Sequence, residues 1–133
     1  MPVPPSRRPS QIFASSSSAP TSAGGDDSAV IVLITTNKQE EAESLAESML
    51  QSDLIACANL VPKVTSIYKW QGKVEKDQEI LMVCKTLSSK VPDLTRFVCS
   101  THSYDEPEVI ALDIKAGSKG YLDWIRQSVG APA

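Results

Sequence analysis

Two long β-type segments joined by one tight turn constrain the fold of this chain more than any other feature. They read IACANLVPKVTSIYKW and VEKDQEILMVCKT, and they flank Gln71-Gly72-Lys73. Because glycine adopts the backbone angles of a tight turn at little cost in conformational energy, the two segments predict a β-hairpin. Pro62 lies inside the first segment, where it would remove a hydrogen bond of the ladder. We therefore expect a bend or a bulge at Pro62.

The two halves of this hairpin differ in polarity. Val74 to Glu79 is mostly polar, whereas Ile80 to Cys84 is apolar. This contrast predicts a base within the core and a projecting tip, with the charged run KVEKDQE forming a solvated face. The strands are also longer than the usual five or six residues. Long and partly apolar strands leave exposed edges, which pairing with another copy of the chain would cover. The hairpin therefore predicts a homo-oligomer.

The remaining elements follow from hydrophobic periodicity. AVIVLITT, residues 29–36, is a β-branched run typical of a strand buried on both faces. NKQEEAESLAESMLQSD then changes to helical periodicity, and Asn37 with Glu40 fits a capping box. SSKVPDLTRFVCSTH predicts a second helix, with Pro92 near its first turn. PEVIALDI predicts a fourth strand, and SKGYLDWIRQSV a short terminal helix.

The order of these elements is β-α-β-β-α-β followed by a helix. This order predicts an α+β fold, namely a ferredoxin-like βαββαβ sandwich with an extra C-terminal helix and a long central hairpin. We assign this domain to residues 29–129. The chain is long enough for one ordinary domain and too short for two.

The first 28 residues form a separate unit. They are rich in Ser, Pro and Ala and contain no acid before Asp26. Such a segment cannot bury enough apolar surface to offset the entropy of ordering, so we expect it to be disordered. Its composition also resembles an organelle transit peptide. We expect a chloroplast location on this basis, with the mitochondrion, the cytoplasm and a plain flexible tail left open.

Composition excludes several classes of protein. No apolar run approaches the roughly 20 residues that span a bilayer, so we expect no membrane insertion. The net charge is −3, and no basic patch with interleaved aromatic residues is present, which disfavours nucleic-acid binding. The three cysteines are odd in number and lack CxxC spacing, which indicates reduced thiols.

The segment THSYDEPE contains the only histidine of the chain, His102. This imidazole, with the carboxylate of Glu108, could bind a divalent ion, and copper has the highest affinity for such ligands. Cys99 lies three residues before His102 on the predicted helix, close enough to share a metal ion. The alternative is structural, since a histidine at a helix C-terminus can bond to the last carbonyl groups. One histidine alone gives a weak site unless several chains meet.

Several of these segments together resemble the CutA divalent-cation tolerance family. The resemblance rests on ACANLVPKVTSIYKWQGKVEKDQEILMVCKT, THSYDEPEVIALDI and GYLDWI, and it extends from about Val30 to Ile125. It implies a ferredoxin-like subunit in a tight homotrimer whose long strands pair between subunits. It also implies a role in metal tolerance, with copper binding in some members, and a likeness to PII signalling proteins.

The metal ligands that the resemblance implies are only partly present. The family's cysteine near the end of the first strand corresponds to Ile34, which cannot bind a metal. The adjacent histidines correspond to Thr101 and His102, so one of the two is missing. The family's acid after proline is kept as Glu108, and the proline after the histidines is replaced by Ser103. We therefore take His102, Glu108 and Cys99 as the candidate metal ligands.

The sequence thus predicts a non-catalytic homotrimer that binds divalent cations, chiefly copper, or confers tolerance to them. No cofactor is expected to be required, although Cu(II) or another divalent metal could bind. No nucleophile with an orienting third group and no phosphate-binding glycine loop is present, which disfavours an enzyme. The alternative is a PII-like trimeric scaffold that binds a partner or a small ligand.

Overall fold

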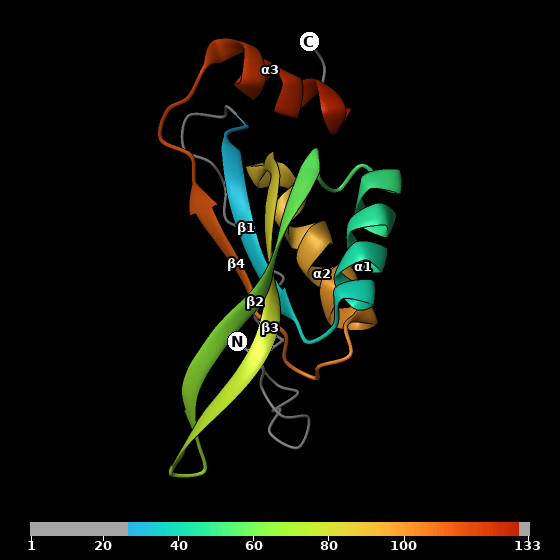
Figure 1. Ribbon diagram of the computed structural model, residues 1–133. Helices are drawn as coiled ribbons and strands as arrows, with labels where there is room; N and C mark the ends of the chain where they lie inside the picture. The colour runs from blue at the N-terminus through green and yellow to red at the C-terminus, as the bar shows by residue number, and fades with distance from the viewer. Residues whose placement is uncertain (1–26, 131–133) are drawn as a thin grey trace.

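The computed structural model describes residues 27–130 and shows one antiparallel sheet with three α-helices (Figure 1). The predicted leader, apart from Asp27 and Ser28, lies outside the described residues. The elements in chain order are β1 (Ala29–Thr36), α1 (Gln39–Gln51), β2 (Cys57–Trp70), β3 (Lys73–Leu87), the 3-10 helix η4 (Ser88–Lys90), α2 (Val91–Thr101), β4 (Val109–Asp113) and α3 (Lys119–Ser128). The strand order is β2-β3-β1-β4. These findings confirm the predicted α+β, ferredoxin-like arrangement with an added terminal helix.

The long hairpin extends well beyond the two helices that cover the core (Figure 1). Its turn consists of Gln71 and Gly72, which have φ angles of 52° and 80°. Positive φ at both central positions is the requirement of a type I′ turn, whose twist matches that of the flanking strands. The register of β2 against β3 shifts between Val61 and Val64. This shift confirms the bulge expected at Pro62.

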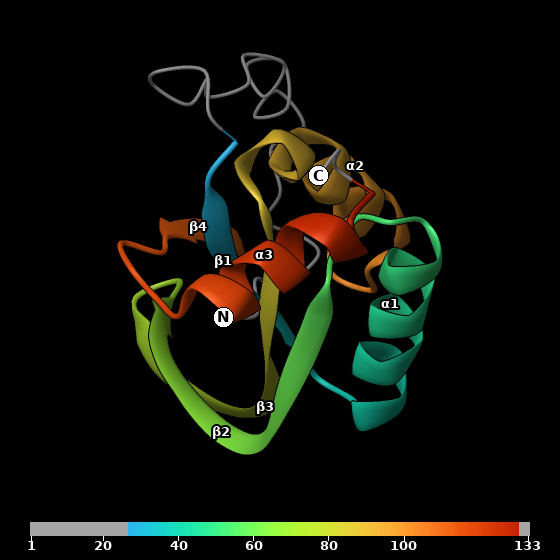
Figure 2. The same cartoon turned by 90° about the horizontal axis from the view of Figure 1, so that it is seen from above.

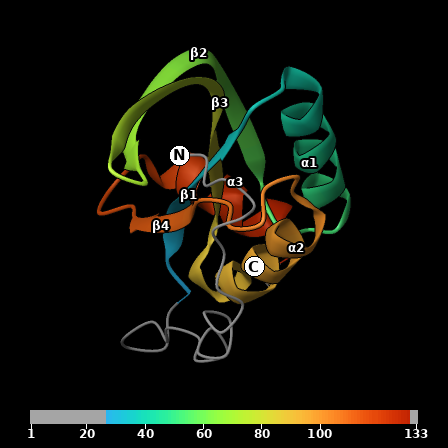
Figure 3. The same cartoon turned by 90° about the horizontal axis from the view of Figure 1, so that it is seen from below.

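The main core lies between one face of the sheet and the helices α1 and α2. Figures 2 and 3 show these two helices on the same side of the sheet. Helical periodicity places their apolar residues toward the strands. The fully buried side chains of this core are Val32 and Ile34 of β1, Ala42 and Met49 of α1, Met82 and Cys84 of β3, and Leu94 and Val98 of α2.

Within residues 27–130, the opposite face of the sheet is covered only at one end. There Ile125 and Val129 pack against Ala29 and Leu87 in a second, smaller core. The prediction that β1 is buried on both faces was therefore wrong for a single chain, since Ile31 and Leu33 are only partly buried. Side chains alternate between the faces of a strand, and α3 is too short to cover the second face along its whole length.

The N-terminus of α1 also differs from its prediction. The helix begins at Gln39, the N-cap is Lys38 with extended backbone angles, and no side chain caps the helix. Asn37 therefore lies one position before the N-cap, where a capping box with Glu40 cannot form. The strand β1 ends at Thr36, as expected, and Asn37 and Lys38 lie between it and the helix. The hydroxyl group of Thr36 donates instead to the Lys38 carbonyl oxygen at 3.0 Å.

Asp27 joins the start of the described chain to the segment before α2. Its Oδ1 atom accepts hydrogen bonds from the Ser88 hydroxyl at 3.0 Å and from the Ser89 N–H at 2.9 Å. Its backbone carbonyl accepts a hydrogen bond from Arg126 at 2.9 Å. Partial burial opposes ionisation, but the bonds from Ser89 and Ser88 prevail and lower the pKa of the Asp27 carboxyl group.

Candidate functional site

His102 is the C-cap of α2, and its side chain has no exposed surface. Its Nε2 atom lies 2.7 Å from the carbonyl oxygen of Thr35, at the end of β1. Its Nδ1 atom accepts a hydrogen bond from the Tyr104 N–H at 3.0 Å. A carbonyl oxygen can only accept, so the proton of the neutral ring resides on Nε2. The imidazole thus links the sheet to the loop that follows α2.

Glu41 supports the same loop from α1. Its carboxylate accepts hydrogen bonds from the Ser103 N–H at 2.7 Å and from the Ser103 hydroxyl at 2.9 Å. Its Oε2 atom also lies 3.6 Å from His102 Nδ1. Three elements, namely α1, β1 and the loop after α2, are therefore joined around His102. The alternative of a structural histidine fits this geometry, although the bonded carbonyl belongs to β1 rather than to α2.

Tyr104 extends this network to the base of the hairpin. Its ring centroid lies 4.6 Å from that of His102, and its hydroxyl donates to Glu79 at 3.0 Å. The hydroxyl of Ser66 also donates to Glu79, whose side chain is buried. Burial, followed by the charge and hydrogen bond of Glu79, raises the pKa of the Tyr104 hydroxyl. This tyrosine is therefore a hydrogen-bond donor at every physiological pH.

The buried position of Glu79 corrects one prediction. Glu79 ends the run KVEKDQE, which was expected to form a solvated face, and its exposed fraction is 1%. The prediction was wrong because Ser66 and Tyr104 supply hydroxyl donors that a buried carboxylate requires. The partners lie 13 and 25 residues away in the chain, so no local sequence signal identifies them.

The three predicted metal ligands lie on neighbouring segments but do not form a ready metal site. Cys99 is half-buried on α2, and Glu108 is half-buried just before β4. Both take part in other interactions. Within residues 27–130, no three side chains of His, Cys, Asp or Glu are grouped to hold a metal ion. In a single chain these residues therefore do not fit a copper site, and their role as ligands stays a prediction.

The other two cysteines also differ in their surroundings. Cys84 is buried, and this burial, with a smaller contribution from the nearby Cys57, raises the pKa of its thiol to about 12. Cys57 is partly exposed, and its Sγ atom lies 3.6 Å from the Tyr121 hydroxyl oxygen. The apolar strand context of both cysteines predicts small core residues. The burial of Cys84 confirms this prediction, whereas the partial exposure of Cys57 shows that it was wrong for that residue.

The model of the CutA1 divalent ion tolerance protein family matches residues 30–128. The chain belongs to this family. It is 51% identical to the human Protein CutA over 86 residues, which cover 65% of this chain and 48% of the human protein. It is 47% identical to the Arabidopsis thaliana protein named Protein CutA, chloroplastic, over 67% of this chain and 49% of that protein. The chain thus spans about half the length of these two CutA relatives.

Shorter CutA relatives match over most of their length. The Divalent-cation tolerance protein CutA of Thermus thermophilus is 44% identical over 91 residues, which cover 88% of it. A solved CutA1 structure from the same organism superimposes with a TM-score of 0.74 at 43% identity, covering 77% of this chain and 99% of that one. The Oryza sativa CutA1 crystal structure gives the same TM-score and identity, covering 75% and 92%. These structures confirm the fold.

The lengths of the helices bear on the expectation that the chain does not insert into a membrane. None of the helices between residues 27 and 130 is both long and apolar enough to cross a membrane.

Proposed function

We propose that this CutA chain acts in divalent-cation tolerance as a homotrimer and without catalysis. The observation that carries the proposal is the incompletely covered face of the sheet. Ile110 and Leu112 of β4 are each 48% exposed, and Val61 of β2 is 42% exposed. Burying such a side chain fully stabilises a protein by about 1.5–3 kcal/mol. A second copy of the chain would cover this surface.

The projecting hairpin supports assembly as well. β2 is an edge strand of 14 residues, and its far half extends past the core. Long exposed edges template pairing with other chains, and a closed oligomer removes them. Ile67 and Val74, near the tip, are 58% and 67% exposed. These apolar residues would be buried by pairing between subunits.

Assembly is tested by replacing an exposed leucine of the open face. We expect Leu112→Lys to shift the protein from trimer to monomer in light scattering coupled to size exclusion. Leu50 is also exposed, at 41%, but lies on α1 away from this face, so Leu50→Lys is the matched control. A trimer that survives Leu112→Lys, or a wild-type protein that is monomeric, would refute this part of the proposal.

Copper binding at His102, Glu108 and Cys99 belongs to the same proposal. A metal needs a lone pair of the imidazole, and the lone pair of Nδ1 accepts the Tyr104 N–H. Coordination at His102 therefore replaces that hydrogen bond, and we expect weak binding. Calorimetric titration with Cu(II) tests this. Saturable binding that His102→Ala and Cys99→Ser abolish, and Cys57→Ser leaves intact, would support these ligands. Copper binding that neither His102→Ala nor Cys99→Ser weakens would rule out these residues as ligands.

The buried imidazole of His102 also supports our proposal that the protein has no catalytic activity. A histidine that acts as a general base needs a free nitrogen within reach of a substrate. Both ring nitrogens of His102 are engaged with backbone groups, and the side chain is buried.

A chloroplast location is the last component of the proposal. The Arabidopsis relative and a rice relative, 46% identical, are both named chloroplastic. The Ser/Pro/Ala-rich composition of residues 1–28 supports import. Fusing these residues to a fluorescent protein in plant cells tests the location. Plastid fluorescence would support it, whereas cytoplasmic or mitochondrial fluorescence would favour the alternatives.

A further inference from the structure

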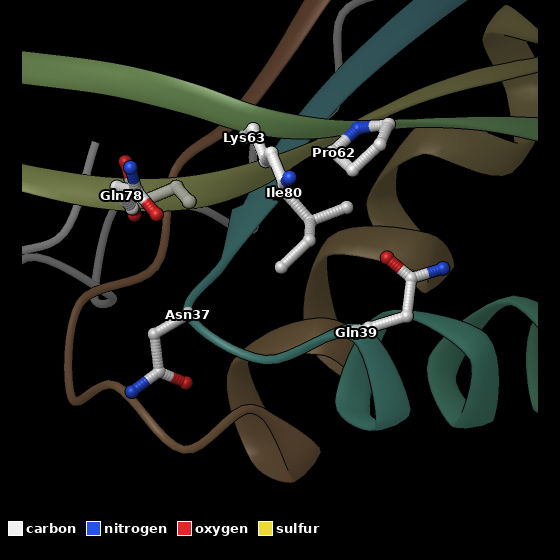
Figure 4. Close-up of a pocket in the computed structure, with 7 residues that line it drawn as sticks. Asn37, Gln39, Pro62, Lys63, Gln78 and Ile80 are labelled. Carbon is white, nitrogen blue, oxygen red and sulfur yellow. The ribbon is translucent and has the colours of Figure 1, made fainter.

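A cleft of about 300 Å³ opens where the hairpin leaves the core (Figure 4). Three separate segments form its walls: the chain before and at the start of α1, the bulge of β2 and the facing part of β3. Ile80 and Glu79 are buried residues of its lining. Ligand sites in proteins begin at about this volume, which suits a small metabolite.

The bulge of β2 places a lysine in this cleft. Lys63 has a φ angle of 62°, in the left-handed region that costs a residue with a side chain about 1–3 kcal/mol. It follows Pro62, which lacks an N–H group, and both lie in the register shift of the hairpin. Strained backbone of this kind is concentrated at binding sites. Figure 4 shows Lys63 and Pro62 side by side above Ile80.

Most polar groups of the cleft are hydrogen-bond donors that can still bind an acceptor. Among residues 27–130, Lys63 makes no ion pair, and the carboxamides of Asn37 and Gln78 make no hydrogen bond. The carboxylate of Glu79 already accepts from Ser66 and Tyr104, so it is held within the protein network. The cleft therefore combines the Lys63 ammonium, the Gln78 carboxamide and the apolar surface of Ile80, next to the Glu79 carboxylate. The Asn37 carboxamide points away from Lys63 and Ile80 (Figure 4).

We propose that this cleft binds a small organic anion. Its carboxylate or phosphate group is held by the Lys63 ammonium and by the carboxamide of Gln78. Its apolar part packs against Ile80 and Pro62. Lysine is a point charge that binds either kind of anion, and the amide N–H groups give direction. This site goes beyond the proposed metal function, since it needs no metal and lies on other residues.

The test is a nuclear magnetic resonance titration of the full chain in its assembled state. One arm uses 4-methylpentanoate as the carboxylate probe, and the other uses butyl phosphate. Buffer is freed of metal with a chelating resin, because soluble chelators are themselves polycarboxylates. We expect saturable shifts of the Gln78 side-chain NH₂ signals and of the Lys63 amide. The arm that saturates at lower concentration identifies the preferred anionic group.

Variants with one charge removed complete the test. Lys63→Gln removes the charge and keeps the length of the side chain, so we expect affinity to fall about tenfold. Lys69 is exposed on the same strand outside the cleft, and Lys69→Gln is the matched control with unchanged affinity. Millimolar probe without saturable shifts in either arm would overturn the proposal. So would binding that Lys63→Gln leaves unchanged, or a cleft shielded from both probes by another copy of the chain.

Discussion

The Nε2 atom of His102 lies 2.7 Å from the carbonyl oxygen of Thr35, which joins the end of α2 to the end of β1. The only histidine of the chain is thus part of the structural framework. Its second nitrogen accepts the Tyr104 N–H, and Tyr104 in turn donates to Glu79. The network reaches from the helical layer to the base of the projecting hairpin.

Replacement of His102 should destabilise the protein without any metal present. His102→Ala removes the hydrogen bonds of the ring to the Thr35 carbonyl and the Tyr104 N–H and opens a cavity. We expect the free energy of unfolding in metal-free buffer to fall by about 2–4 kcal/mol. Denaturant unfolding measures this. Thr101 is exposed beside it, and Thr101→Ala should cost less than about 0.5 kcal/mol. Equal losses in both variants would contradict the structural role.

The hydroxyl of Tyr104 should contribute to stability through Glu79. Tyr104→Phe removes one of the donors to a buried carboxylate, and we expect a loss of about 1–3 kcal/mol in unfolding free energy. Tyr121 is exposed, and Tyr121→Phe should change stability by less than about 0.5 kcal/mol. Thermal unfolding of both variants at one protein concentration provides the comparison. A Tyr104→Phe protein as stable as the wild type would show that Glu79 does not need this donor.

Thiol reactivity should separate Cys84 from the other cysteines. Burial raises the pKa of the Cys84 thiol to about 12, so almost no thiolate is present at pH 8. We expect a disulfide reagent to leave Cys84 unmodified in the native protein and to modify it after denaturation. Mass spectrometry of the labelled peptides measures this. Labelling of native Cys84 at the rate of a denatured thiol would contradict the described core.

Asp27 should make stability depend on acid pH. Its pKa is lowered in the folded protein, so its contribution is present above the unfolded value, near 3.9, and is lost as pH falls through the folded value. We expect Asp27→Ala to lower the melting temperature at pH 7 and to have little effect below the folded pKa. Asp113, exposed at the end of β4, supplies the control Asp113→Ala. A deficit of the same size at every pH would contradict the ionic contribution.

The backbone features with local causes could be predicted from the sequence. Gly72 in the turn and Pro62 at the bulge act through their own φ preferences and missing groups, and the structure has both features where they were expected. The start of α1 was missed although β1 ends at Thr36 as expected, because Lys38, with extended backbone angles, takes the N-cap position expected for Asn37. Local capping patterns do not contain that information.

The candidate site was less predictable, because its partners come from distant segments. His102 was recognised as notable, but its bonds to Thr35 depend on how α2 docks against β1, 67 residues away in sequence. Glu79 looks like any exposed hairpin acid until Tyr104 is placed beside it. A bulge was expected at Pro62, but the positive φ angle of the neighbouring Lys63, and its place in the cleft, appear only in the structure. The open face of β1 appears only when α3 is placed at one end of the sheet.

Native mass spectrometry of the full chain during a copper(II) titration tests the proposed homotrimer and its copper site together, because it reports assembly and metal stoichiometry in one spectrum. We expect a trimer before any copper is added, and weak but saturable copper uptake that His102→Ala abolishes while the trimer persists. A monomer at every protein concentration, or graded copper adducts that ignore His102→Ala, would contradict it.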